Sequence, residues 1–235
     1  MKRLLILTAL ALLPLCFAQA RVYLVSVGIA DYPGTKSDLR VSDADARTIA
    51  NVFSKNGDAQ IAVLTNTEAT QSAVLAKMHT TFADAKSDDT VMFYFSGHGT
   101  QGELVCYDGL LPYQSVIDML KGCPAEKKIV IADACYAGKM RQRRQQPSAY
   151  QQQSVMFFLS SRTNEQSRET PFKNSLFTIF LERGLRGGAD TNRDRTITAR
   201  ELYDFVHKGV ADATKGGQHP VMWGKFDNNM TIIKW

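Results

Sequence analysis

The sequence lacks the features that mark several specialised classes of protein. Its 235 residues carry a formal charge of only +5, and they contain no internal repeat and no linker long enough to separate two domains. With 44% hydrophobic and 22% charged residues, the composition argues against a disordered, collagen-like or disulfide-scaffold chain. The weak charge does not favour nucleic acid as a partner. A globular chain remains, long enough for one large α/β domain.

Long hydrophobic runs are also missing, apart from one at the start of the chain. Residues 1–20 begin with two basic residues, continue through an apolar segment of about 14 residues and end in Ala-Gln-Ala. This order is typical of a secretory signal peptide, and the apolar segment is short for a membrane span. We expect cleavage to leave a secreted or periplasmic domain, residues 21–235, with no stable membrane insertion. Because cleavage removes two basic and no acidic residues, the formal charge falls from +5 to +3.

Cysteine is scarce, with four residues in the whole chain. Cys16 lies inside the expected signal peptide, and the bulky Leu15 before it argues against a lipoprotein anchor there. The processed chain would keep Cys106, Cys123 and Cys135. In an oxidising compartment Cys106 and Cys123 can pair and leave one free thiol, although the sequence does not fix the distance between them.

Apolar β-rich runs alternate with segments of helical periodicity along the chain, which predicts a parallel sheet covered by helices on both faces. Strands are expected within 21–34 and at 59–65, 91–95, 129–132 and 155–159, with one or two short strands near the C-terminus. Helices are expected at 42–53, 69–83, 113–120, 174–183 and after residue 198. These elements predict a three-layer α/β/α sandwich with a mostly parallel six-stranded sheet.

Two of the expected strands end in small residues that surround a histidine and a cysteine. The stretch DTVMFYFSGHGTQ, residues 89–101, presents His98 between two glycines, and KKIVIADACYAG, residues 127–138, presents Cys135. Sites in open α/β sheets lie at the carboxyl ends of strands, so we expect both side chains at one edge of the sheet. A thiol nucleophile needs a proton partner within reach. The two stretches therefore predict a Cys-His dyad.

The two blocks resemble the active-site blocks of the caspase, metacaspase and paracaspase group of cysteine peptidases. The likeness extends over most of the processed chain, including the DYPG turn, the stretch LFTIFLERGLRGGAD and a late Gln-His-Pro. Asp133 stands where the strict caspase signature has glutamine, which favours the bacterial, metacaspase-like branch. The resemblance implies a caspase-like fold and a cysteine endopeptidase that acts on proteins or peptides and requires no cofactor.

The resemblance also implies roles for individual residues. Cys135 would attack the peptide carbonyl, and His98 would supply the proton to the leaving amine. The backbone amides of Gly99 and Cys135 would form the oxyanion hole. Asp45 and Asp133 match acidic positions of the metacaspase specificity pocket, which implies cleavage after Arg or Lys.

Other interpretations of these residues stay open. Asp45 can instead serve as a helix N-terminal charge, and Asp133 as a hydrogen-bond acceptor at a strand end. A pocket specific for Asp would need an arginine, for which Arg162 and Arg168 are candidates. A catalytically silent caspase-like binding protein is an alternative of a different class, and a thiol hydrolase of non-peptide amides or esters is a third.

Residues 139–153 form a segment of basic residues and glutamines without apolar periodicity, and we expect an exposed flexible loop. Caspase-like chains are commonly cut between the cysteine block and the next strand. The resemblance therefore makes this loop a candidate for self-processing, with a merely solvated basic loop as the alternative. The candidate positions are Lys139, Arg141, Arg143 and Arg144.

A calcium-loop pattern near the C-terminus is a weak candidate for a metal site. Its positions 1, 3, 5 and 12 are Asp190, Asn192, Asp194 and Glu201. Arg195 replaces the glycine of position 6, which strains the turn and adds positive charge, so a polar turn with Thr198 capping the final helix is favoured. Metacaspases often bind calcium at a separate acidic site near the histidine loop, where this chain has only Glu103 and Asp108.

Overall fold

A six-stranded sheet forms the centre of the molecule, a computed structural model that describes residues 20–55, 57–134, 155–161 and 173–235. The strand order is β2-β1-β3-β6-β7-β9, and only the edge strand β9 is antiparallel to its neighbour. The strands are β1 (Val22–Gly28), β2 (Ala59–Thr65), β3 (Thr90–Gly97), β6 (Lys127–Ala134), β7 (Met156–Leu159) and β9 (Val221–Gly224). The mostly parallel six-stranded sheet predicted from the sequence is confirmed.

The strand β3 lies in the interior of the sheet, and all of its residues are buried. Because successive side chains of a strand point to opposite faces, β3 contributes to two separate cores. Phe93 and Phe95 pack in one core, and Met92 and Tyr94 pack in the other. Burial on both faces explains why the sequence of β3 is almost continuously apolar rather than alternating.

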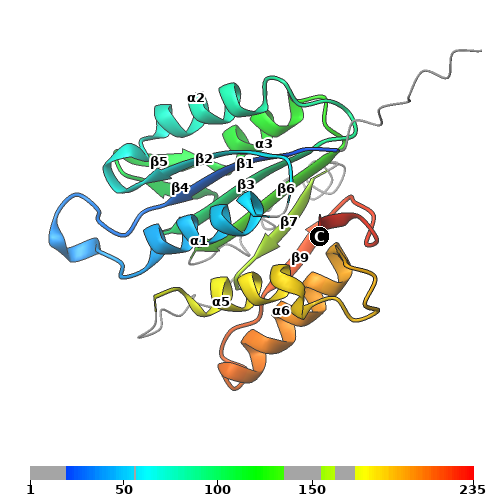
Figure 1. Ribbon diagram of the computed structural model, residues 1–235. Helices are drawn as coiled ribbons and strands as arrows, with labels where there is room; N and C mark the ends of the chain where they lie inside the picture. The colour runs from blue at the N-terminus through cyan, green and yellow to red at the C-terminus, as the bar shows by residue number, and fades with distance from the viewer. Residues whose placement is uncertain (1–19, 56, 135–154, 162–172) are drawn as a thin grey trace, which may run out of the picture.

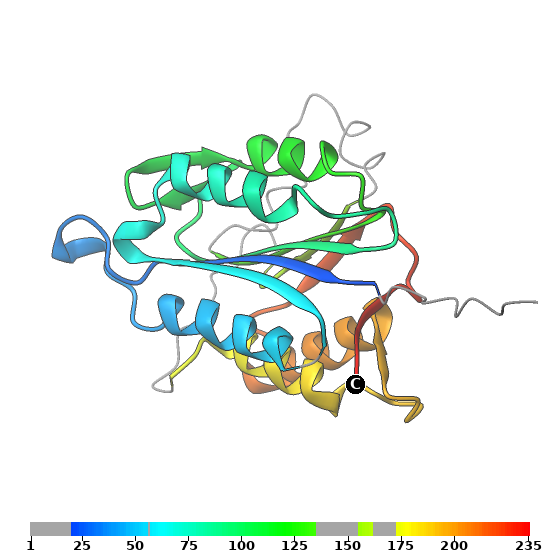
Figure 2. The same cartoon turned by 45° about the horizontal axis from the view of Figure 1, so that its top comes forward.

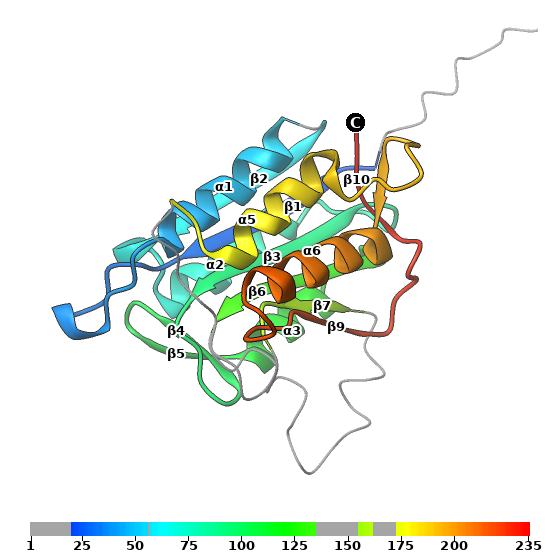
Figure 3. The ribbon, with the colours of Figure 1, turned by 90° about the horizontal axis from the view of Figure 1, so that it is seen from below.

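Five α-helices lie in the described part of the chain, and they cover the two faces of the sheet (Figure 1). The helices α2 (Gln71–Phe82) and α3 (Tyr113–Lys121) cover one face. The other face carries α1 (Ser42–Ser54), α5 (Leu176–Arg183) and α6 (Ala199–Ala213). Figure 2 shows the helical layers on either side of the sheet, and Figure 3 shows α1, α5 and α6 side by side. The predicted three-layer sandwich is confirmed.

Polar residues at the helix N-termini satisfy backbone amides that have no partner within the helix. The Thr70 side chain accepts a hydrogen bond from Ala73 N–H at the start of α2, and Ser175 caps α5 in the same way. Thr198 forms a capping box with Glu201 at the start of α6, as the sequence predicts. Each such cap typically stabilises a helix by about 1 kcal/mol.

In the described ranges, two short antiparallel pairs lie outside the main sheet. The hairpin of β4 (Glu103–Cys106) and β5 (Gly109–Pro112) follows the histidine block and was not predicted. Near the C-terminus, β8 (Thr196–Thr198) pairs with β10 (Thr231–Lys234). The one or two short strands expected near the C-terminus correspond to β9 and β10, and only β9 of these belongs to the main sheet.

Cys106, at the end of β4, and Cys123, after α3, are buried and free. The Cys123 thiol instead donates to the carbonyl of Phe82 at 3.7 Å. The disulfide that these two cysteines can form in an oxidising compartment is therefore absent from the structure. Among the described helices, none is both long enough and apolar enough to cross a membrane.

Candidate active site

The strands β3 and β6 end side by side, and this brings the two blocks singled out in the sequence together. The last residue of β3, Gly97, pairs in parallel register with Ala134, the last residue of β6. His98 comes directly after Gly97, and Cys135 comes directly after Ala134 in the sequence. Cys135 itself lies outside the described residues, so its role as nucleophile stays a prediction.

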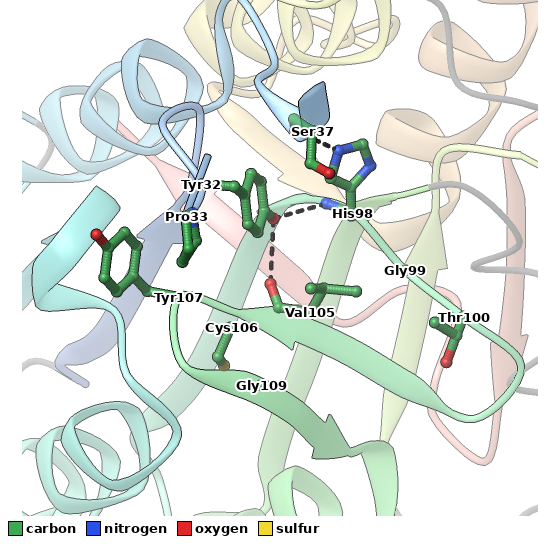
Figure 4. Close-up of a pocket in the computed structure, with 10 residues that line it drawn as sticks. All are labelled: Tyr32, Pro33, Ser37, His98, Gly99, Thr100, Val105, Cys106, Tyr107 and Gly109. Atoms are coloured by element: carbon green, nitrogen blue, oxygen red, sulfur yellow. Dashed lines mark hydrogen bonds between the residues drawn. The ribbon is translucent and has the colours of Figure 1, made fainter. Parts of the chain in front are cut away.

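The imidazole of His98 is oriented by a backbone carbonyl (Figure 4). Its Nε2 lies 2.7 Å from the carbonyl oxygen of Ser37. Because a carbonyl oxygen can only accept, Nε2 carries a proton, and Nδ1 of the neutral ring is an acceptor. This tautomer leaves Nδ1 suited to take a proton from a thiol.

Tyr32 contacts His98 through both its hydroxyl group and its ring. Its hydroxyl accepts a hydrogen bond from His98 N–H at 2.9 Å and donates one to the carbonyl of Val105 at 3.1 Å. The two rings lie 4.9 Å apart between centroids. Gly97 permits this contact, because a Cβ at that position would lie 2.7 Å from the tyrosine oxygen. Burial raises the pKa of Tyr32 well above its usual value, so the hydroxyl remains neutral and able to donate.

If His98 has the catalytic role predicted from the sequence, Tyr32→Phe should lower kcat about 10- to 100-fold with little change in KM, because small displacements of a catalytic group have effects of this order. The substitution removes one hydrogen-bond partner from His98 N–H and one from Val105. Steady-state kinetics would measure the effect. Tyr23→Phe is the matched control, since Tyr23 is equally buried and its hydroxyl donates a hydrogen bond to the backbone carbonyl of Asp84, far from His98. Equal kinetics for the two variants would refute a positioning role for Tyr32.

The hairpin of β4 and β5 fixes the segment after His98. Gly99 forms a β-bridge with β4, and hydrogen bonds flank it on both sides. On one side Val105 N–H donates to the carbonyl of His98 at 3.0 Å, and on the other Thr100 N–H donates to the carbonyl of Glu103 at 2.9 Å. The bridge does not use the N–H of Gly99. Its geometry is therefore compatible with the oxyanion role predicted for that amide.

Asp45 and Asp133 converge near the N-terminus of α5. Asp45, in the first turn of α1, is fully buried and accepts hydrogen bonds from Ser96 Oγ at 2.9 Å and Asn174 Nδ2 at 2.9 Å. Ser175 joins the two acids, because its N–H donates to Asp45 at 3.0 Å and its hydroxyl donates to Asp133. The structure thus brings the two predicted acids together, and it also shows that they anchor the N-cap of α5.

Burial and the neighbouring charge of Asp133 raise the pKa of Asp45 to about 7, despite its three hydrogen-bond donors. In an unfolded chain the pKa of this group is near 3.8. The folded state therefore binds the Asp45 proton more tightly than the unfolded chain does. This tighter binding stabilises the fold fully below about pH 4, and the stabilisation is lost as the pH rises through about 7.

We expect the free energy of unfolding of the wild type to fall, relative to that of Asp45→Asn, as the pH rises from about 4 to about 7. The asparagine keeps the side-chain shape and cannot titrate, so the difference between the proteins isolates this one group. Urea denaturation at several pH values would measure it. Parallel pH profiles for the two proteins would contradict the assignment.

The acidic side chains of the calcium-like loop accept hydrogen bonds from nearby residues of the chain. Asp190 accepts hydrogen bonds from the backbone amides of Asp194 and Arg195, and Arg195 has a φ of 63°, the left-handed conformation that glycine normally takes. Glu201 turns to the N-cap, where Thr198 donates to it. Burial alone would raise the pKa of Glu201, but hydrogen bonds outweigh it and lower the pKa. Within the described ranges no group of three or more His, Cys, Asp or Glu side chains could hold a metal. Calcium binding here stays a prediction without support from this geometry.

Several residues with predicted roles lie outside the described ranges, so their roles stay predictions. These are Cys16, Cys135, the candidate processing positions Lys139, Arg141, Arg143 and Arg144, and the arginines Arg162 and Arg168.

Comparisons with known proteins agree on one kind of fold. A family model described as a caspase domain matches residues 21–230. Among solved structures, protein GSU0716 from Geobacter sulfurreducens is 17% identical with a TM-score of 0.69, over 92% of this chain and 97% of that one. Caspase-1 from Spodoptera frugiperda is 18% identical with a TM-score of 0.70, over 92% and 90%. No curated protein matches. At these identities the solved structures show the fold alone.

Proposed function

The chain belongs to the caspase domain family, and on this premise we propose that it is an exported endopeptidase that uses a Cys135-His98 dyad and cleaves after Arg or Lys. Membership supports a cysteine peptidase with protein substrates. The observation that carries the finer proposal is that β3 and β6 end at paired residues. His98 directly follows the last residue of β3, and Cys135 directly follows the last residue of β6 in the sequence.

In the proposed mechanism, the Cys135 thiol gives its proton to Nδ1 of His98 and the thiolate attacks the scissile carbonyl carbon. The negative charge that develops on the oxygen is stabilised by the amides of Gly99 and Cys135, each worth about 3 to 4 kcal/mol. His98 then protonates the leaving amine, and a thioester remains. Water attacks the thioester, with His98 as the base, and releases the carboxylic acid and the thiol. The carbonyl of Ser37 holds the ring in place throughout.

The specificity part of the proposal rests on Asp45 and Asp133. The two acids joined through Ser175 share negative charge beside the end of β6, although Asp45 is only partly ionised near pH 7, and this charge favours a cationic substrate side chain over an acidic one. Asp45 accepts three hydrogen bonds, whereas a carboxylate has about four acceptor positions, so it can accept one more donor. Anchoring α5 therefore leaves an acceptor position for a substrate Arg or Lys, and because both acids are buried, the proposal requires the substrate side chain to enter their surroundings.

Cleavage of a peptide library randomised on both sides of the scissile bond tests the proposal. We expect Arg or Lys immediately before the cut, and no cleavage by Cys135→Ala. Consistent cleavage after Asp would refute the specificity and keep the peptidase. A complete lack of cleavage, with thiol-dependent hydrolysis of simple esters or amides, would favour the non-peptide hydrolase instead.

Export is proposed from residues 1–20 alone, which have the order of a signal peptide. N-terminal sequencing of the protein recovered from the periplasm or medium should begin at Arg21. Recovery of an intact Met1 chain from the cytoplasm only would contradict export.

We also expect the purified protein to cut itself within residues 139–153, where four basic residues follow the cysteine block. Intact-mass measurement over time would identify fragments that end at Lys139, Arg141, Arg143 or Arg144. Cys135→Ala is the matched control and should stay whole. A wild-type chain that remains uncut while it hydrolyses added peptides would refute self-processing.

A further inference from the structure

A cavity of about 510 Å³ opens beside His98, and the proposed mechanism does not use it (Figure 4). We call it the His98 pocket. It lies between the turn after β1 and the β4–β5 hairpin. The lining residues that matter for its chemistry are Tyr32, Pro33, His98, Val105, Tyr107 and Gly109.

The walls of the His98 pocket suit an uncharged side chain. Figure 4 shows Tyr32, Pro33 and Tyr107 gathered on one side of His98. Among the described residues that line the cavity, none is an Asp, Glu, Lys or Arg. Asp108, in the turn of the hairpin, accepts a hydrogen bond from Gln71 N–H at 2.8 Å, which directs it to the start of α2. Aromatic rings, a proline and a valine together favour an apolar or aromatic occupant.

The His98 pocket and the acidic pair lie on opposite faces of the sheet. Tyr32 belongs to the core beneath α2 and α3, together with Cys106 at the base of the pocket. Ile129 and Ile131 of β6 belong to the core beneath α1 and α5, and Asp133 continues the same alternation. His98 follows the end of β3, between these two features.

In this arrangement the residues before and after the scissile bond of a bound peptide would face different features of the protein. If the residue before the scissile bond extends toward the acidic pair, the leaving amine must lie within hydrogen-bond distance of the His98 ring. The Cα of the next residue is bonded directly to that amine nitrogen. Its side chain therefore begins beside His98, where the pocket opens.

We propose that the His98 pocket is the subsite for the substrate residue immediately after the scissile bond, and that it selects apolar and aromatic side chains there. This inference rests on the proposed peptidase function and adds a second point of specificity to it. Together the two features define a preferred cleavage sequence of Arg or Lys followed by a residue such as Phe, Tyr or Leu.

The test uses internally quenched peptides that keep Arg before the bond and carry Phe, Leu, Gly, Asp or Lys after it. Burial of a large apolar side chain predicts a kcat/KM at least about 10-fold higher for Phe than for Gly or Asp. Tyr107→Ala should reduce this ratio to below about 3-fold because it removes one wall. Leu110→Ala is the matched control, since Leu110 is 45% exposed on the same hairpin and does not line the cavity.

A charge substitution gives a second, independent readout. Tyr107→Asp should raise the kcat/KM for Lys after the bond relative to Phe, by about 10-fold or more, because the new carboxylate can pair with the ammonium group. An unchanged ratio in both Tyr107 variants, each shown to be folded by circular dichroism, would overturn the assignment of the pocket.

Labelling separates failure of this inference from failure of the proposed function. A peptide fluoromethyl ketone ending in Arg reacts with Cys135 without any residue after the bond. Labelling of the wild type together with indifference to the residue after the bond would refute the pocket and keep the peptidase. Neither labelling nor cleavage would refute both. Loss of labelling in Tyr107→Ala would show that Tyr107 supports the dyad, and would also overturn the assignment.

Discussion

Replacing Cys135 by alanine is expected to abolish peptide hydrolysis, with kcat at least about 10⁴-fold lower than in the wild type. The thiol is the only nucleophile in the proposed mechanism. Cys106 also lines the His98 pocket, but it is buried, and burial raises its pKa to about 12, so it does not supply a thiolate in place of Cys135. His98→Ala should cause a loss of similar size, because the thiol remains protonated without its acceptor. Single-turnover assays with a quenched peptide would measure both.

The double variant shows whether the two residues act as one unit. In a dyad the second substitution costs little once the first has been made, so the double variant should be no worse than Cys135→Ala. Losses that instead multiply would mean that Cys135 and His98 act independently. His79→Ala is the control for His98, since His79 lies in the last turn of α2 and does not line the His98 pocket.

The second large effect is expected for Asp133→Asn, which should lower kcat/KM for Arg peptides by roughly 10²- to 10³-fold. This is the range expected when one partner of a buried, hydrogen-bonded charge pair is lost. The asparagine oxygen can still accept from Ser175, so the cap of α5 is retained. The substitution therefore changes mainly the charge of residue 133.

Comparison of Arg with citrulline, its uncharged isostere, isolates that charge. We expect the wild type to prefer Arg strongly and Asp133→Asn to prefer it much less, because Asp45 is then the one acid of the pair that remains. Asp190→Asn, in the exposed loop before β8, should leave the preference intact. An Arg preference as strong in Asp133→Asn as in the wild type would contradict a role for Asp133 in specificity and leave it only as an anchor of α5.

Much of the architecture could be predicted from local signals. The apolar runs of β3 and β6 and the periodicity of α1 and α2 are properties of contiguous residues, and the structure confirms them. The paired ends of β3 and β6 also follow from sequence, because consecutive parallel strands of such a sheet carry their sites at the same edge. The likeness to caspase-like peptidases added the pairing of Asp45 with Asp133, which spacing alone would not have given.

The surroundings of His98 could not be predicted, for two physical reasons. The hydrogen bond between Tyr32 and His98 joins residues 66 positions apart, and it depends on how the turn after β1 folds over the sheet edge. The acceptor at Ser37 is a backbone carbonyl, a group that every residue carries, so no side chain marks it in the sequence. The hairpin of β4 and β5 could not be predicted because its two strands have four residues each and, unlike the equally short β7, are interrupted by a glutamate, a glycine or a proline.

The most direct test of the whole account is labelling by a peptide fluoromethyl ketone that ends in Arg, followed by mass mapping of the adduct. We predict a single adduct on Cys135 in the wild type, and strongly reduced labelling in His98→Ala and Asp133→Asn. An otherwise identical ketone ending in Asp should react far more slowly. No adduct, as a silent binding protein would give, or equal labelling by the two ketones would contradict the proposed peptidase and its specificity.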